Sequence, residues 1–408
     1  MYTAPHNLYT YDEVMQFVES EDVKFIRLAF CDVRGRQKNV SVMPGELKRA
    51  VTYGVSFDAS AVPGFAPPER SDLFLHPDLS TLAFLPWRPT HGRVVRAYCD
   101  VRYPDGTPFG RDCRQLLRAA VRRARERGLT VSIGTEYEFY LFCTDETGAP
   151  TKRPFDSAGY MDIAPEDKGE NIRREICFAL CDMDITPESS HHEEGPGQNE
   201  IDFRYRDAMT AADNATTFKM VVRTIAMQNG LFADFSPKPL PGESGNGMHI
   251  NLSVKSAGGE NCMDAFMAGI LARIGEITAF LNPTEESYAR LGACKAPAYV
   301  SWARENRSAL IRIPAAQGDA QRMELRSPDP EANPYLAFAL LIHAGLDGVE
   351  AHLAPPPPVE ENLFDAPASV TDALPRLPGG LEEASRLARE SEFIRRVLPG
   401  GADGFLVP

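Results

Sequence analysis

Alternating apolar and polar positions dominate the first hundred residues of the chain. The alternation in residues 23–35 and 36–42 predicts two strands of a hairpin that turns at the sequence "DVRG". Residues 82–87 and 94–101 repeat the pattern and are expected to add further strands. The amino-terminal part of the chain, to about Tyr103, is therefore predicted to form a small sheet domain.

The pattern changes after a turn-rich linker at residues 105–112, where Asp112 is placed to cap a helix that ends at Gly128. Helical and strand patterns then alternate, which predicts a larger domain of mixed elements. Helices are expected at residues 170–183, 216–230, 262–281 and 333–353, and strands at residues 129–142 (one long strand or a pair), 245–254 and 322–327. The sequence "APPPP" (354–358) predicts the end of the compact part, followed by one amphipathic helix at residues 381–398.

Three of the expected strands have unusual polar faces. Residues two apart on a strand point to the same side, so each strand presents one apolar face and one polar face. An exposed face would normally mix Lys, Thr and Gln, whereas these faces carry acids, arginines and a histidine. The polar faces consist of Glu136 and Glu138, of His249, Asn251 and Ser253, and of Arg322, Glu324 and Arg326. We expect the three faces to line one polar cavity.

The sequence "HHEEGPGQNEIDF" (191–203) adds two histidines and several acids. It is typical of a zinc site, a hard-metal site or a solvated acidic loop. Converging carboxylates can stay ionised together only around cations, and an oxygen-rich set favours Mg²⁺ or Mn²⁺ over structural zinc. The converging acids are predicted to be Glu136, Glu138, Glu193, Glu200 and Glu324. Glu194, His191 and His192 are expected to support the ligands rather than bind metal.

Arginines accompany these acids, and their planar guanidinium groups bind carboxylates and phosphates in pairs of hydrogen bonds. The arginines concerned are Arg290, Arg307, Arg312, Arg322 and Arg326. The combination is expected where a triphosphate and its metals meet an anionic substrate, although no Gly-x-x-x-x-Gly-Lys-Ser/Thr loop occurs. The glycine-rich sequence "GESGNGMH" (242–249) is interpreted as a loop that lets a small ligand approach the backbone.

Composition narrows the class of protein. The 408 residues carry a net charge of −14, which argues against nucleic acid as the main partner. Eight cysteines without a Cys-x-x-Cys pair favour a reducing compartment. The start, "MYTAPHNLYTYDEV", has no signal pattern, and no apolar run is long enough to span a bilayer. A cytoplasmic protein without a membrane partner is therefore expected.

The motifs together resemble the glutamine synthetase family in its bacterial type I form, over roughly residues 15–365. The motifs that carry the resemblance are "SFDASAVPGF", "GTEYEFYLF", "AGYMDIAPEDKGENIRREI", "HHEEGPGQNEIDF", "FSPKPLPGESGNGMHINLS", "NRSALIRIP" and "RMELRSPDPEANPYLAFALLIHAGLDG". The resemblance implies an α+β fold: a β-grasp domain at residues 15–103 and a catalytic domain with a strand-lined funnel at residues 108–408. It also implies ATP as co-substrate, two or three Mg²⁺ or Mn²⁺ ions per site, and hexameric rings or dodecamers with sites between neighbouring subunits.

The resemblance carries residue roles with it, position by position. One metal would be held by Glu138, Glu193 and Glu200, and the other by Glu136, His249 and Glu324. Substrate would be bound by Tyr160, Gly245, Arg290, Arg307 and Arg326. Nucleotide would be bound by Tyr205, Asn251, Ser253, Arg307, Arg312 and Arg322. The catalytic residues would be Asp58, Glu193 and Arg312; Asp58 of one subunit would reach the next subunit's funnel and share the ammonium pocket with Tyr160.

The implied reaction joins glutamate and ammonia through γ-glutamyl phosphate, but the chain departs from the family pattern in its flap segment. In "RLGACKAPAYVSW" (290–302), one residue short, Lys295 stands where the family has a glutamate that helps to bind and deprotonate ammonium. One charge pair at ~4 Å and an effective dielectric of ~20 is worth about 4 kcal/mol, so the change of sign is large. One hypothesis is that the acceptor is an organic amine or polyamine. Its rival is that Lys295 points away and that Asp58 and Glu193 suffice; a non-catalytic regulatory paralogue is a third.

The carboxyl-terminal end is a second departure. Type I enzymes usually continue with a helical tail that clasps the opposite ring, whereas this sequence stops at "GGADGFLVP". On that basis, pairing between rings is expected to be weaker or differently built.

Overall fold

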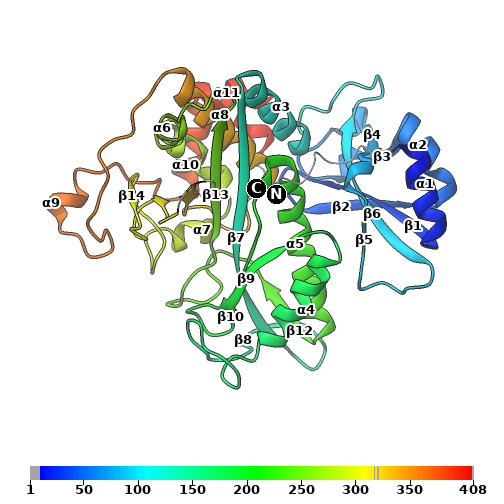
Figure 1. Ribbon diagram of the computed structural model, residues 1–408, viewed down its shortest axis with the longest axis horizontal. Helices are drawn as coiled ribbons and strands as arrows, with labels where there is room; N and C mark the ends of the chain where they lie inside the picture. The colour runs from blue at the N-terminus through cyan, green and yellow to red at the C-terminus, as the bar shows by residue number, and fades with distance from the viewer. Residues whose placement is uncertain (1–9, 317, 319–320, 407–408) are drawn as a thin grey trace.

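The computed structural model describes residues 10–316, 318 and 321–406. The first nine residues, on which most of the expectation about a signal segment rests, lie outside them. The chain forms a smaller amino-terminal unit and a larger unit that holds most of the helices (Figure 1). Among the described residues, every helix is too short or too polar to serve as a bilayer span.

The amino-terminal unit is a sheet in the strand order β2-β1-β6-β4-β3, with β5 added beside β6. Its strands are β1 (Val23–Cys31), β2 (Gln37–Val42), β3 (Val55–Asp58), β4 (Asp72–Pro77), β5 (Ala83–Phe84) and β6 (Arg93–Arg102). The predicted hairpin is confirmed, because β1 and β2 pair antiparallel, with Ile26 opposite Val42. Helices α1 (Tyr11–Ser20) and α2 (Leu47–Tyr53) complete the unit, together with short 3₁₀ turns at Pro44–Glu46, Ala59–Ala61, Pro68–Arg70 and Leu79–Thr81.

The larger unit is built on a second sheet, in the strand order β14-β15-β16-β13-β7-β10-β9, with β8, β11 and β12 paired to other parts of β7. Its strands are β7 (Leu129–Thr144), β8 (Pro150–Pro154), β9 (Pro187–His192), β10 (Gln198–Phe203), β11 (Arg206–Asp207), β12 (Leu231–Asp234), β13 (Met248–Ser256), β14 (Trp302–Arg304), β15 (Ile311–Ile313) and β16 (Met323–Leu325). The segment that the sequence left open as one strand or two is therefore the single long strand β7. It passes through the middle of the unit (Figure 1).

The larger unit also contains several helices, the first four of which contact strands of this sheet. They are α3 (Cys113–Glu126), α4 (Glu170–Cys181), α5 (Ala208–Gln228), α6 (Met263–Leu281), α7 (Glu285–Arg290), α8 (Pro334–Glu350), α9 (Ala368–Thr371), α10 (Leu381–Glu390) and α11 (Glu392–Val397), with a 3₁₀ turn at Ala402–Gly404. Asp112 caps α3 as predicted, since its side chain accepts a hydrogen bond from the Arg114 backbone N–H at 3.0 Å. α5 begins eight residues earlier than expected, because Asp207 caps it and its first turns are rich in alanine.

The core lies between β7 and these helices. Tyr137, Phe139 and Leu141 of β7 are fully buried, and Tyr137 packs against Phe218 of α5 with ring centroids 5.2 Å apart. The apolar face of β7 is thus held against α5, which leaves Glu136 and Glu138 on the opposite side. The predicted division of this strand into an apolar face and an acidic face is confirmed.

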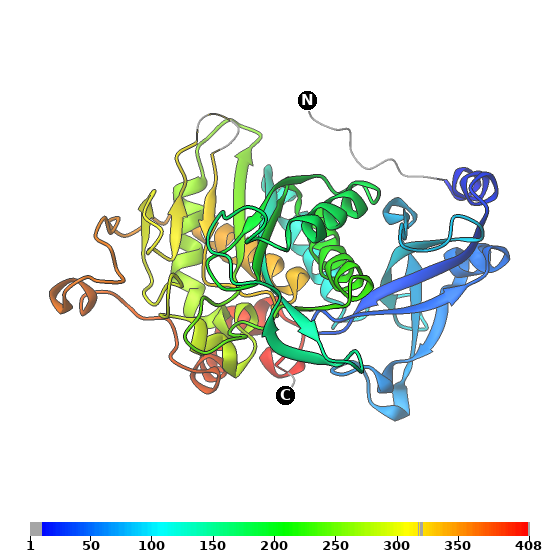
Figure 2. The same cartoon turned by 90° about the horizontal axis from the view of Figure 1, so that it is seen from below.

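The prediction that the compact part ends at "APPPP" is wrong. The chain after it binds back to the edge of the larger sheet, because Trp302 donates its indole N–H to the Pro356 carbonyl oxygen at 2.6 Å. Farther on, Phe393 and Ile394 are buried and α10 and α11 pack on α6 (Figure 2). The single helix expected at residues 381–398 is two helices, since Ser391 ends α10 and caps α11 through the Ile394 N–H at 3.0 Å, and the short helix α9 precedes them in the tail.

His343 of α8 gives the fold a testable dependence on pH. Burial, with the charge of Arg123, lowers the pKa of His343 to about 4. Arg123 donates a hydrogen bond to its Nδ1 at 3.0 Å, an arrangement that needs the neutral ring. A depressed histidine pKa means that this stability is present above the ordinary value near 6.5 and is lost as pH falls toward 4. We expect the free energy of unfolding to fall by about 2 kcal/mol more in the wild type than in His343→Gln between pH 7 and pH 5.

Urea denaturation of both proteins at the two pH values measures this difference. His352→Gln is the control, because His352 is exposed and should keep the wild-type response. An identical loss of stability in His343→Gln and in the wild type would contradict the assignment.

Candidate active site

The strand register brings the predicted acids and histidine together. His249 of β13 lies opposite Glu136 of β7, and Asn251 of β13 lies opposite Glu324 of β16. On the other side of β7, Glu138 lies opposite Glu200 of β10. The expectation that these polar faces line one cavity is confirmed in part: β16, β13 and β7 are adjacent in the sheet and contribute Glu136, Glu138, His249, Arg322 and Arg326, whereas the remaining residues of the three faces lie outside the lining.

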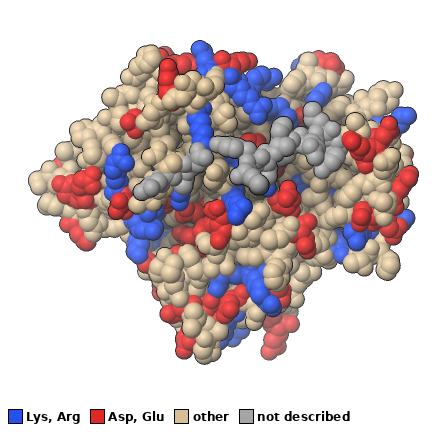
Figure 3. Space-filling view, viewed as in Figure 1, with Lys and Arg blue, Asp and Glu red and all other residues tan. Residues whose placement is uncertain are grey.

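The cavity has a volume of about 510 Å³. Its lining includes six acidic and six basic side chains: Glu136, Glu138, Glu193, Glu194, Glu200 and Asp202, and Arg290, Lys295, Arg307, Arg312, Arg322 and Arg326. The acids come from β7, β10 and the loop after β9, whereas the basic residues come from the segments around α7, β15 and β16. One wall is therefore suited to cations and the other to anions. On the face of the molecule shown in Figure 3, acidic and basic side chains are likewise interspersed.

The first acidic cluster consists of Glu136, His249 and Glu324. Nδ1 of His249 lies 3.3 Å from Oε2 of Glu136 and 3.6 Å from Oε1 of Glu324. Burial raises the pKa of Glu136, but a hydrogen bond and the charge of His249 outweigh it and hold the value at about 2. These three residues offer ligand atoms within 4.8 Å of one another, so they fit a divalent cation.

The second acidic cluster consists of His191, Glu193 and Glu200, with Glu138 beside it. Nε2 of His191 lies 3.5 Å from Oε1 of Glu200, and its Nδ1 lies 3.8 Å from Oε1 of Glu193. Burial and the charge of Glu138 raise the pKa of Glu193 to about 8. Burial and the charges of Asp202 and Glu138 also raise the pKa of Glu200 well above its ordinary value.

The paired acids explain why a cation fits here. Glu138 opposite Glu200, and Glu136 opposite Asp202, are like charges in directly opposed positions, which destabilises a sheet. The protein offers Glu193 and Glu200 no arginine within ion-pair distance among the described residues, and their proton affinity is raised instead. A divalent cation would replace the protons and remove the repulsion. The donor set of carboxylates and imidazole suits Mg²⁺ or Mn²⁺.

The two neighbouring histidines have different roles. His192 is fully buried; its Nε2 lies 2.8 Å from Asp156 and its Nδ1 lies 2.6 Å from the Glu193 carbonyl oxygen. It therefore positions the loop that carries Glu193, as the sequence analysis expected. His191 lies in the cavity wall instead, and its Nδ1 has no hydrogen-bond partner among the described residues. His191 is expected from the sequence to support the metal ligands. In the structure it lies close to Glu193 and Glu200, two candidate ligands, so it is a candidate ligand as well.

Arginines form the opposite wall. Arg326 and Arg312 both pair with Glu324, with N–O distances of 2.5 Å and 2.6 Å. Arg290 is 3% exposed and donates to the Ser327 carbonyl oxygen at 2.7 Å. Arg307 is exposed and lines the same wall. Guanidinium groups held in this way can bind a carboxylate or phosphate without reorganising.

The glycine-rich loop packs closely against other parts of the protein, and its Gly245 also lines the cavity. A Cβ atom on Gly245 would lie 2.4 Å from the Pro237 carbonyl oxygen and 2.9 Å from Cγ of Arg290. A Cβ atom on Gly247 would lie 2.8 Å from Nε2 of His249. The glycines are therefore required by the protein's own arginine and histidine, independently of any ligand.

Five residues carried over from the resemblance lie outside the cavity lining: the buried Glu324, and Asn251, Ser253, Tyr205 and Asp58. Asn251 is behind Glu136, donating to its Oε1 at 2.8 Å and accepting from Nε of Arg322 at 3.0 Å. Ser253 is half-buried farther along β13, and Tyr205 is 52% exposed beside Gly134 of β7. Asp58 is exposed in the amino-terminal unit and hydrogen-bonds Ser60 at 2.9 Å. Its expected role in the funnel of a neighbouring subunit remains a prediction.

Lys295 lies in the cavity wall and forms an ion pair with Glu194. The rival hypothesis that it points away from the site is not matched by this geometry. Glu194, which the sequence analysis treated as a supporting residue, cancels the positive charge of the lysine. Tyr160 stands nearby in the same lining, with its ring 5.4 Å from that of His191.

Sequence reasoning missed one acid, Asp202. It lies opposite Glu136 and lines the cavity, and burial with the charge of Glu136 raises its pKa to about 7. Asp202 is two residues after Glu200 on the same strand, so the rule that placed Glu136 and Glu138 on one face would have found it.

This arrangement defines a class of protein. It is typical of an enzyme that brings divalent cations and small anions together between two charged walls. Comparison with known proteins then gives the family. The family model described as the glutamine synthetase β-grasp domain matches residues 22–104, and the model of the glutamine synthetase catalytic domain matches residues 110–402. The chain belongs to the glutamine synthetase family, and the expected α+β class, a β-grasp domain followed by a catalytic domain, is confirmed.

Individual relatives agree with the family models. A glutamine synthetase of Clostridium saccharobutylicum is 44% identical over 405 residues, covering 96% of this chain and 91% of that protein. One from Staphylococcus epidermidis is 43% identical over 411 residues, covering 97% and 92%. Among solved structures, GmaS superposes in its ADP complex with a TM-score of 0.87 at 30% identity, and without ligand with 0.86 at 29%; each covers 96% of this chain and 93% of the other.

These relatives indicate an enzyme, a ligase of the glutamine synthetase type. Enzymes of the family act on small molecules and use ATP and divalent metals, which agrees with the carboxylate clusters and arginines of the cavity.

Proposed function

We propose that the protein forms γ-glutamyl amides from glutamate, an amine and ATP, with ammonia as the default amine and glutamine as the product. The γ-phosphoryl group of ATP passes to the side-chain carboxylate of glutamate, giving ADP and γ-glutamyl phosphate. The neutral amine then attacks the activated carbonyl carbon, and inorganic phosphate leaves. The observation that carries this proposal is the cavity with carboxylate clusters on one wall and arginines on the other.

We assign cation binding to the acidic clusters of the cavity and anion binding to its arginines. Glu136, His249 and Glu324 would hold one cation, and Glu138, Glu193 and Glu200 the other, with His191 beside them. When bound, Mg²⁺ or Mn²⁺ would supply charge neutralisation for the phosphoryl group.

The chain's own groups would position the anions. Arg326, Arg290 and Arg307 would bind the carboxylates of glutamate, and Arg312 and Arg322 the phosphates. Glu324 holds Arg312 and Arg326 in place through the ion pairs described above. Asn251 would act through Arg322 and Glu136, which it connects.

A specific observation favours a second candidate, an organic amine or polyamine as acceptor. The Lys295–Glu194 ion pair places a cationic group where the family has a carboxylate that attracts ammonium. Because the pair is neutral as a whole, this part of the wall offers ammonium little net attraction. An amine that binds through its carbon chain and arrives unprotonated would be affected less. The assembly of subunits into rings, with Asp58 completing a neighbouring site, belongs to the same proposal.

Phosphate release from ATP and glutamate, measured with ammonium and with a panel of alkylamines and diamines, tests both candidates. Lys295→Glu should raise kcat/KM for ammonium about tenfold, because a carboxylate there attracts the cation and most of the Coulomb energy is screened at an exposed site. Lys48→Glu makes the same charge change on the exposed face of α2 and should leave kcat/KM unchanged. A wild-type kcat/KM for ammonium that equals or exceeds the value for every organic amine would remove the second candidate. No phosphate release with any amine would contradict the proposed function.

A further inference from the structure

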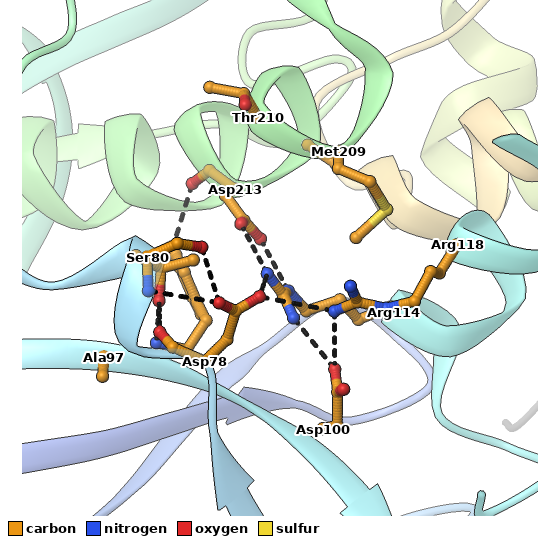
Figure 4. A network of polar contacts seen from close by, with 12 residues as sticks. Asp78, Ser80, Ala97, Asp100, Arg114, Arg118, Met209, Thr210 and Asp213 are labelled. Carbon is orange, nitrogen blue, oxygen red and sulfur yellow. Dashed lines mark hydrogen bonds and ion pairs between the residues drawn. The ribbon is translucent and has the colours of Figure 1, made fainter. Parts of the chain in front are cut away.

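A second cavity, of about 580 Å³, lies between the two units of the chain. We call it the interdomain cavity. The amino-terminal unit contributes β6 and residues 78–83, and the larger unit contributes α3, the start of α5 and residues 183–185. It shares no lining residue with the active-site cavity. Figure 4 shows the polar network at its floor, where Asp78 and Asp100 face Arg114 and Asp213 approaches from α5.

Two of the arginines in this cavity form ion pairs with acids. Arg114 is 6% exposed and bonds Asp78, Asp100 and Asp213 at 2.9, 2.9 and 3.0 Å. Arg118 lies 3.0 Å from Asp100 and 3.4 Å from Asp78 (Figure 4). The aspartates at the floor of the cavity are therefore already paired with arginines, and these ion pairs connect the two units of the chain.

Three further arginines of the lining, Arg96, Arg122 and Arg125, have no carboxylate within ion-pair distance among the described residues. Of the remaining acids, Asp207 caps α5, and Asp184 lies 3.9 Å from Arg206. The acids of the cavity are thus engaged elsewhere, which leaves these three arginines without a direct carboxylate partner.

Arg96 is the decisive residue, because it is only 4% exposed. Its guanidinium group donates one hydrogen bond to Oγ1 of Thr217 at 3.0 Å and lies 3.9 Å from the centre of the Tyr98 ring. Its Nε has no hydrogen-bond partner among the described residues. Burying a charged group without a counter-ion or full hydrogen bonding is costly, and buried charges in proteins are normally paired. An anion in the cavity would supply what Arg96 lacks.

We propose that the interdomain cavity binds a small organic anion with at least two negative charges, of the phosphate or dicarboxylate type. Arg96 would bind it at the buried end, and Arg122 and Arg125 on the exposed face of α3 would close the open end. Met183, Ile185 and Met209 supply an apolar wall for a short carbon skeleton. Because Arg96 lies on β6 and the other two arginines on α3, the anion would connect the two units and stabilise their arrangement.

Isothermal titration of the full-length protein with inorganic phosphate, a simple phosphomonoester and succinate tests the proposal. The active site also binds anions, so the titrations are repeated in Arg326→Ala, which weakens the active site alone. We expect one binding event per chain to persist in Arg326→Ala and to weaken at least about tenfold in the double variant Arg122→Ala/Arg125→Ala. Both arginines are exposed, so this variant should fold.

The matched control is Arg153→Ala/Arg174→Ala, which removes two exposed arginines outside the cavity and should bind as the wild type does. The tighter ligand identifies phosphate or carboxylate as the recognised group. Binding that disappears in Arg326→Ala, binding that is equal in both double variants, or no binding below about 10 mM would overturn the proposal. None of these outcomes affects the proposed ligase reaction, which is assayed separately by phosphate release.

Discussion

Replacing Glu138 by glutamine is expected to lower glutamate-dependent phosphate release about a thousandfold, equivalent to about 4 kcal/mol of transition-state stabilisation. Glu138 lies between the two acidic clusters, opposite Glu200 and 3.9 Å from Nε2 of His249. The substitution keeps the size of the side chain and an oxygen that can accept the Gly247 N–H, now bonded at 2.8 Å. It removes one negative charge from a set whose function is to hold divalent cations.

The same substitution should leave the metal-free protein as stable as the wild type or more so. Glu138 and Glu200 are like charges in opposed positions, and a neutral amide removes that repulsion. Steady-state assays at saturating Mg²⁺ and Mn²⁺, with thermal unfolding in a chelator, measure both effects. Glu146→Gln, in the exposed turn after β7, is the control. Activity within about tenfold of the wild type would show that this acid is not needed to hold metal.

Strand periodicity was sufficient to predict most of the metal-binding wall. The positions of Glu136, Glu138 and His249 follow from a period of two along strands whose other face is continuously apolar. What periodicity cannot give is which strands are neighbours. The adjacency of β16, β13 and β7 depends on pairing between residues more than seventy positions apart, which no local pattern specifies.

The remaining failures have local physical causes. His191 and His192 are adjacent on a strand and point to opposite sides, so one faces the cavity and the other the interior; alternation along the strand predicts these different surroundings. The tail after residue 358 is rich in proline and polar residues, which predicts an open segment. The tail is buried because α10 and α11 cover a face of α6 that would otherwise be exposed. The sequence of the tail does not show that this face is available.

Lys295 illustrates a different limit. The sequence shows that a lysine replaces the family's glutamate, but it does not show what the lysine contacts. Its partner, Glu194, is 101 residues away and belongs to the motif that supplies the metal-ligand candidates. Lys295 and Glu194 compensate each other in charge, so neither can be interpreted alone. For this reason the effect of Lys295→Glu on the choice of amine includes the loss of the ion pair with Glu194.

Metal binding is expected to release protons, and the apparent affinity for Mg²⁺ or Mn²⁺ should rise steeply between pH 6 and pH 8. The pKa of Glu193 is raised to about 8 and that of Asp202 to about 7, in both cases first by burial and then by a neighbouring carboxylate. At neutral pH the metal-free site is therefore partly protonated, whereas a cation requires carboxylates. Each proton displaced gives up to about a tenfold gain in affinity per pH unit below the raised pKa.

The stability of the metal-free protein should change with pH in the opposite direction: it should fall as pH rises. A carboxyl group whose folded pKa lies above its unfolded value contributes stability at low pH, and that contribution is lost as pH rises through the folded value. Metal-free protein should thus lose stability between about pH 4, near the unfolded pKa values, and about pH 8, the highest folded value, and saturating Mn²⁺ should restore it, because a ligand that binds only the folded state stabilises it. Titration calorimetry in two buffers of different ionisation enthalpy counts the released protons, and Glu193→Gln should release fewer. Proton release that is zero in the wild type, or unchanged in Glu193→Gln, would mean that the acids of this wall are already ionised and that something other than a cation keeps them together.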